Sequence, residues 1–187
     1  FYDSRIRSFF ENRMRLADYR VRRAGAALDA GYTFRQSEIR LGFEINHLKA
    51  APRIGSPALP ELRGFQKRLF ARYELDMTNN AVIPTHGFRL SGEARYFFES
   101  PGANRDFPQA EAQATVFHTF GEKNITFIDA SGGTTFDREA PPMETFQLGG
   151  TGRLSAYRRN EFSGNHFLLA RGGYLREVYT LPSLLGG

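Results

Sequence analysis

Apolar and polar residues alternate along much of the chain. In residues 39–46 every odd position, from Ile39 to Ile45, is apolar, and every even position is polar or glycine. Successive side chains of a β-strand point to opposite faces, so this alternation predicts a strand with one apolar face. Similar alternation, weaker where alanine and glycine are frequent, predicts seven strands, near residues 19–34, 38–50, 65–76, 87–99, 107–120, 124–136 and 164–178.

The lengths of these strands and of their connections favour a membrane barrel. Strands of soluble proteins usually have about 5 or 6 residues, whereas a tilted strand that crosses a bilayer needs about 9 to 11. Short turns alternate with longer loops, so that all the long loops fall at one end, as in outer-membrane barrels. A soluble antiparallel sandwich or ligand-binding barrel, with its apolar face inside, would show the same period of two. The turns are at 35–37, 77–86 and 121–123, and the loops at 51–64, 100–106 and 137–163.

Charges of both signs occupy the polar face of the predicted strands. A mixed set of this kind suits a wet or plugged lumen better than a lipid-facing surface. We therefore expect an all-β fold, an antiparallel transmembrane β-barrel to which residues 1–187 contribute a single segment, with apolar residues such as Leu41 and Leu90 facing lipid. The charges expected to face the lumen are Arg40, Glu44, Arg72, Glu93 and Arg95.

The composition argues against several classes of function. The 25 basic and 20 acidic residues are spread along the chain, so we expect no nucleic-acid partner. No apolar run of about 18 residues indicates a transmembrane helix. The strings LSGEA and ASGGT lack the flanking glycines of a nucleophile elbow, cysteine is absent, and the four histidines are scattered. We therefore expect no catalytic residue, cofactor or metal site in this segment.

The stretch FQLGGTGRLSAYRRNEFSGNHF, residues 146–167, places glycines and arginines between two predicted strands. Gly149, Gly150 and Gly152 lack the strand–loop–helix context of a phosphate-binding loop. Their conformational freedom would instead allow a long loop to fold back on itself. An ordinary surface loop is the alternative interpretation.

Several motifs together resemble one family. Asp76, Pro84 and Gly87 in LDMTNNAVIPTHGFRL resemble the D-x(n)-P-x-x-G turn of the bacterial surface antigen barrels, which include outer-membrane assembly and two-partner secretion transporters. FQLGGTGRLSAY resembles the loop that re-enters the lumen of those barrels. The segments GYTFRQSEIRLGFEI, PALPE and LSAYRRNEFSGNHFLLARGGYLRE are most similar to the barrel fused behind bacterial patatin-like phospholipases.

The resemblance implies a re-entrant loop over 137–163 with a tip that departs from the family pattern. Ser155 stands where the transporter loop has its arginine, and Ala156 where it has glycine. A neutral serine cannot make the charge-assisted contact of an arginine with the inner wall. Tyr157 would be shielded against that wall. Three flanking arginines would then meet lumen carboxylates such as Glu93, Glu111 or Asp129; they are Arg153, Arg158 and Arg159.

The resemblance also implies a role and a location. The chain would be an incomplete segment of a barrel of about 16 strands in the bacterial outer membrane, with strands missing at one or both ends. It would anchor or translocate a patatin-like phospholipase fused upstream, a lipid acyl hydrolase, and would have no catalysis of its own. Its expected partners are outer-membrane lipid, the upstream hydrolase domain and the outer-membrane assembly machinery. The alternatives are a protein-translocating or assembly pore of the same superfamily, and a soluble β-barrel that binds an apolar ligand.

Overall fold

The protein is a curved sheet of long antiparallel strands. A computed structural model describes residues 1–11, 14–55, 59–121 and 123–176. None of these residues forms a helix long and apolar enough to cross a lipid bilayer. The strands are β1 (Tyr2–Glu11), β2 (Met14–Phe34), β3 (Ser37–Ile54), β4 (Leu62–Asp76), β5 (Gly87–Glu99), β6 (Phe107–Phe120), β7 (Asn124–Thr134), β8 (Phe146–Leu148), β9 (Phe162–Gly164) and β10 (His166–Arg176).

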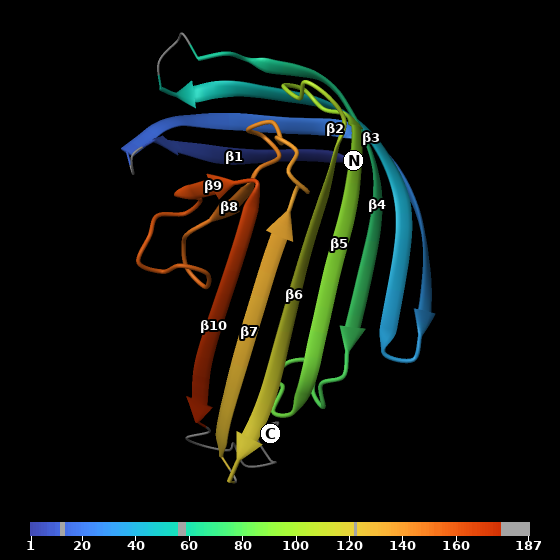
Figure 1. Cartoon of the computed structure of the whole chain (residues 1–187), viewed down its shortest axis with the longest axis vertical. Helices are drawn as coiled ribbons and strands as arrows, with labels where there is room; N and C mark the ends of the chain where they lie inside the picture. The colour runs from blue at the N-terminus through green and yellow to red at the C-terminus, as the bar shows by residue number, and fades with distance from the viewer. Residues whose placement is uncertain (12–13, 56–58, 122, 177–187) are drawn as a thin grey trace, which may run out of the picture.

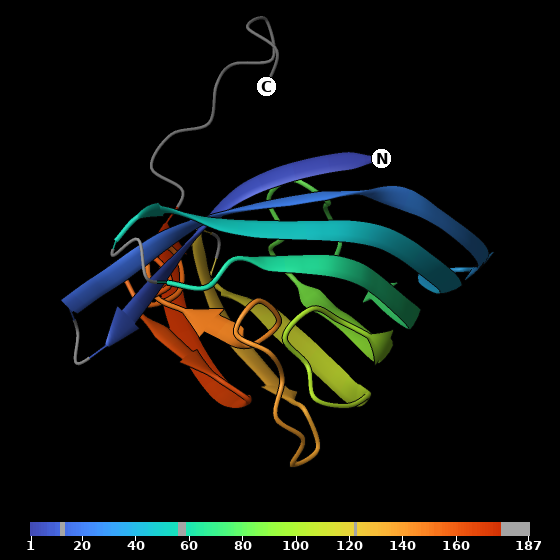
Figure 2. The ribbon, with the colours of Figure 1, turned by 90° about the horizontal axis from the view of Figure 1, so that it is seen from above.

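Eight of these strands form one sheet in the order β1-β2-β3-β4-β5-β6-β7-β10, and β8 pairs with β9 in a separate sheet of two strands. Every neighbouring pair is antiparallel. The large sheet bends strongly and stays open, with β1 and β10 as its two edges (Figures 1 and 2). The all-β, antiparallel prediction is thus confirmed, and the sheet of the described residues is not closed.

The strand bounds differ from the predicted ones mainly in the first part of the chain. β1 was not predicted, β2 begins at Met14 instead of near residue 19, and β3 continues to Ile54 through part of the predicted loop. The hydrophobic pattern reverses here, because Tyr19 and Val21 are buried while the neighbouring Arg20 and Arg22 are exposed. The predicted loop 137–163 contains β8 and the beginning of β9.

The two faces of the sheet have opposite character. Leu28, Ile128 and Leu168 lie on the convex face and are 82%, 66% and 85% exposed. Every second residue from them along the same strands lies on this face as well. An apolar surface of this extent marks contact with lipid or another protein. A soluble barrel that binds an apolar ligand would instead bury these side chains inside.

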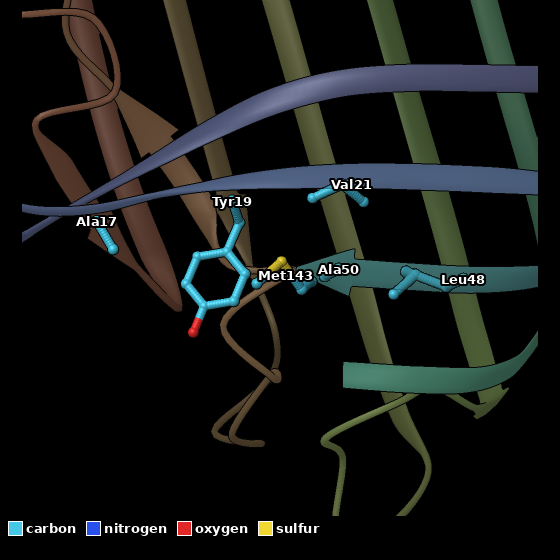
Figure 3. Packing of buried hydrophobic residues seen from close by; sticks show 6 residues of the cluster. All are labelled: Ala17, Tyr19, Val21, Leu48, Ala50 and Met143. Atoms are coloured by element: carbon cyan, nitrogen blue, oxygen red, sulfur yellow. The ribbon is translucent and has the colours of Figure 1, made fainter. Parts of the chain in front are cut away.

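The main cluster of buried apolar side chains lies on the concave face, beneath the loop that follows β7. Met143 from this loop is 2% exposed and packs among apolar residues of β2 and β3 (Figure 3). The other buried members of the cluster are Ala17, Tyr19, Val21, Leu48 and Ala50. A second cluster forms at β5 and β6, where the Phe97 and Phe107 rings stack with centroids 4.6 Å apart.

Candidate functional site

Ion pairs between neighbouring strands cover the concave face. Arg68 of β4 pairs with Glu44 of β3 at 2.7 Å, and Arg171 of β10 pairs with Asp129 of β7 at 2.5 Å. In the middle of the sheet Glu93 of β5 accepts from Arg72 of β4 at 3.1 Å, and also from Arg95 of its own strand at 2.5 Å. Arg95 also reaches Glu111 of β6 at 2.5 Å. Cross-strand pairs of opposite charge stabilise a sheet, so these contacts hold the register of the wall.

All five charged residues predicted to face the lumen lie on this concave face. The register shows it directly, because Arg40 is opposite Arg72, Glu44 is opposite Arg68, and Glu93 is opposite both Arg72 and Glu111. Arg40 also pairs with Asp29 and Glu38, each at 2.7 Å. That this face lines a lumen stays a prediction, since the described sheet is open.

Glu144 connects the loop to three strands of the wall. Its carboxylate accepts hydrogen bonds from Arg23 of β2 at 2.7 Å and from Gln66 of β4 at 2.9 Å. Its backbone carbonyl accepts from Gln109 of β6 at 2.8 Å. The Glu144 side chain is only 9% exposed, and that of Arg23 is 20% exposed. Because neither charge of this pair is well hydrated, each charge depends on the other for its stabilisation.

Arg7 of β1 holds the backbone on either side of Glu144. Its guanidinium donates to the carbonyl oxygens of Met143 and Thr145, and to the Thr145 hydroxyl at 3.1 Å. The same three loop residues therefore receive contacts from β1, β2, β4 and β6. Only a sheet that curves around the loop brings these strands to one place, so the loop lies inside the curve. We call residues 143–145 the latch.

The glycine-rich tip after β8 is a compact set of turns. Gly149, Gly150 and Gly152 all have positive φ, of 120°, 92° and 84°. A Cβ on Gly149 would lie 2.2 Å from the Arg158 carbonyl oxygen, so this close approach of two backbone segments requires glycine. The amide of Gly150 donates to the Tyr157 carbonyl at 3.2 Å, which closes the tip.

Among the described residues the tip forms no ion pair with the wall, although Arg153 lines a cavity together with Glu93 and Glu111 of the concave face. The Tyr157 side chain packs against Phe162 within the loop, with ring centroids 4.8 Å apart, and is 38% exposed instead of shielded. Arg153 donates to the carbonyl of Gln147, also within the loop, at 3.2 Å. In the part of the chain that the structure describes, the Ser155 side chain has no hydrogen-bond partner.

The wall carboxylates that loop arginines were expected to meet are already paired. Glu93, Glu111 and Asp129 bind arginines of the strands, so within the described residues the expected contacts with Arg153, Arg158 and Arg159 are absent. The observed ion pair has the opposite arrangement, because a loop carboxylate, Glu144, pairs with a wall arginine, Arg23. The sequence signal was PPMET, residues 141–145, where an apolar and an acidic residue follow two prolines in a polar loop.

The turn motif at the opposite end of the sheet has a structural role. Asp76 accepts from the Thr78 amide at 3.0 Å and pairs with Arg89 at 2.8 Å. Gly87 has φ of 104°, and a Cβ there would lie 2.1 Å from the Met77 carbonyl oxygen. These contacts close the turn between β4 and β5. Pro84 lies within it, half-buried.

The charged groups of the concave face mostly pair with one another. Among the described residues no group of three histidine, aspartate or glutamate side chains is placed to hold a metal ion. A cavity of about 530 Å³ on the concave face is lined by charged groups that include Arg5, Arg7, Arg68 and Glu44. The lining of this cavity is predominantly polar and charged.

Comparison with known proteins agrees with this architecture. Residues 2–173 match the Omp85 superfamily domain. No curated protein sequence matches the chain. The matched region covers β1 to β7 and most of β10, together with the loop that carries the latch. The chain therefore belongs to the Omp85 superfamily and is a β-barrel protein of the bacterial outer membrane.

Proposed function

We propose that this chain is the membrane-embedded barrel wall that anchors, or helps to translocate, a patatin-like lipid acyl hydrolase located upstream in the same polypeptide. The hydrolase supplies the chemistry, and the barrel supplies the membrane attachment. Three segments support the link by their resemblance to barrels fused behind such enzymes; they are GYTFRQSEIRLGFEI, PALPE and LSAYRRNEFSGNHFLLARGGYLRE.

The observation that carries the anchoring role is the latch. Four strands bind residues 143–145, and Met143 is packed in the largest buried cluster. A loop held in this way obstructs the inside of the curve, and a wall braced by it suits a stable anchor. Outer-membrane lipid and the outer-membrane assembly machinery are the partners that such a role needs.

A second candidate is a protein-translocating or assembly pore of the same superfamily. The charged cavity on the concave face favours it, since a polar lining suits a passage for a polar chain. In that case the latch would be a gate whose contacts break during transport.

One experiment separates the two candidates. The full-length protein, purified from the outer-membrane fraction, is tested for hydrolysis of a fluorogenic phospholipid and for conductance in planar bilayers. The anchoring proposal expects hydrolysis and little conductance, in wild type and in a Glu144→Gln variant alike. The pore candidate expects conductance that rises when Glu144→Gln releases the latch, while the control Glu139→Gln, at an exposed position of the same loop, changes nothing. A full-length protein without any acyl hydrolase activity would refute the proposed fusion.

A further inference from the structure

Three cations stand side by side on the convex face, in a row across β2, β3 and β4. Arg22 is directly opposite Lys49, and Lys49 is directly opposite Arg63. All three are exposed. They lie on the same face as the exposed apolar residues, because an even number of residues separates Arg22 from Leu28 on β2 and Lys49 from Phe43 on β3.

No carboxylate of the described residues pairs with this row. Like charges directly opposite each other destabilise a sheet, because their Cβ atoms lie only about 5 Å apart. Among the described residues none of the three makes a salt bridge, whereas Lys67, the next cation along β4 on the same face, is paired with Glu99 at 2.7 Å. The Asp18 carboxylate of β2 is already bonded by Arg15, at 2.7 Å. An anion from outside the described residues would therefore relieve the repulsion among these three cations.

Two shallow grooves meet at this row, and charged residues line both. One groove, of about 250 Å³, contains Arg20, Arg22, Lys49 and Arg53. The other contains Arg22, Lys49 and Arg63 beside His47. No acidic residue lines either groove. Several cations around a shallow surface groove suit a ligand with more than one negative charge.

The row lies at the height of lipid headgroups. On β3 the apolar convex residues run from Ile39, which is opposite Tyr32 and Tyr73, to Ile45. Lys49 is ten residues beyond Ile39, a rise of roughly 33 Å along the strand. A tilt of about 40° reduces this to about 25 Å, the usual height of the apolar band of such barrels. The row therefore marks the boundary opposite the short turns, at the end of the long loops, which is the external end in outer-membrane barrels.

We propose that Arg22, Lys49 and Arg63 bind the phosphate groups of a phosphorylated lipid in the outer leaflet, a diphosphorylated glucosamine lipid of the lipid A type. Its acyl chains would lie along the apolar residues below, and its phosphates would neutralise the cation row. Arg20 and Arg53 extend the site along the first groove. This site is independent of what lies upstream of the barrel, so it stands whether or not the hydrolase proposal does.

The test uses the full-length barrel in detergent, titrated with lipid A and followed by native mass spectrometry. Each cation near an anionic surface contributes about fivefold to binding, so the triple variant Arg22→Gln, Lys49→Gln, Arg63→Gln should bind on the order of 100-fold more weakly. The matched control Arg35→Gln, Arg105→Gln, Lys123→Gln removes the same charge at exposed positions outside the row and should bind as wild type.

Dephosphorylated lipid A provides a test that needs no variant, and it decides the matter even if the triple variant fails to fold. The wild-type barrel should lose affinity for lipid A by a similar factor when the phosphates are removed. Equal binding of the two forms, or equal loss in the triple variant and its matched control, would overturn the proposal. So would binding of phosphatidylglycerol as tight as that of lipid A, which would indicate unselective attraction of anionic lipid.

Discussion

Removal of the Glu144 charge is the perturbation that bears most directly on the latch. Glu144→Gln keeps the size of the side chain and one acceptor oxygen for Gln66, but it leaves Arg23 without its carboxylate. Within the described residues Glu144 is the only carboxylate that Arg23 pairs with, and the Arg23 Nε is buried without a partner. The variant therefore leaves a poorly hydrated positive charge near Arg7.

The magnitude follows from the burial of the pair. Breaking a fully buried ion pair costs about 3 to 5 kcal/mol, and losing a hydrogen bond to a charged group costs about 1.5 to 3 kcal/mol. Arg23 keeps 20% of its side-chain exposure and Glu144 keeps 9%, so the lower range applies. We expect Glu144→Gln to lower the free energy of unfolding by about 2 to 3 kcal/mol.

The assay is chemical unfolding of the complete barrel in lipid vesicles, with proteolysis of the loop measured in parallel. A double-mutant cycle with Arg23→Met isolates the pair and should give a coupling energy of about 1 to 3 kcal/mol. Glu139→Gln, at an exposed position of the same loop, is the control and should change neither readout. A coupling energy near zero together with unchanged proteolysis of the loop would refute the latch as a stabilising contact.

Three further predictions concern the two faces and the loop. Leu41→Arg on the convex face should destabilise the membrane-inserted barrel by about 2 to 4 kcal/mol, whereas Arg40→Leu on the concave face should cost much less; equal tolerance in vesicle-folding yields would reverse the facing. Met143→Ala should lower the free energy of unfolding by about 2 to 4 kcal/mol, and an unchanged value would mean that the buried cluster forms without it. Gly149→Ala should loosen the tip, seen as faster proteolysis there, because its Cβ meets the Arg158 carbonyl; cleavage at the wild-type rate would contradict this.

The sequence predicts the sheet well where one face is uniformly apolar. Residues 39–46 alternate without exception, and the structure places them in β3 with Leu41 exposed on the convex face and Glu44 buried on the other. The prediction fails at the beginning of β2, because Tyr19 and Val21 turn inward to pack against Met143 while arginines face outward. Periodicity of two carries no information on which face a distant loop will cover.

The candidate site was harder to predict because its partners are remote in the chain. Glu144 meets Arg23 and Gln66, which lie 121 and 78 residues away. The glycines of the tip serve a tight turn at Gly149, whereas the ion pair with the wall comes from Glu144, between two prolines and β8. Local composition identifies a loop that can fold back, but the curvature of the whole sheet decides where it binds.

The most direct test of the docked loop is the labelling of single cysteines on intact cells. The chain has no cysteine of its own, so Met143→Cys and Asn104→Cys can each be probed with a bulky, membrane-impermeant maleimide. Asn104 is exposed in the neighbouring long loop, whereas Met143 of the latch is 2% exposed against β2 and β3. We predict rapid labelling at position 104 and none at position 143 until the barrel is denatured. Equally fast labelling at both positions would contradict a loop held against the inner face of the barrel.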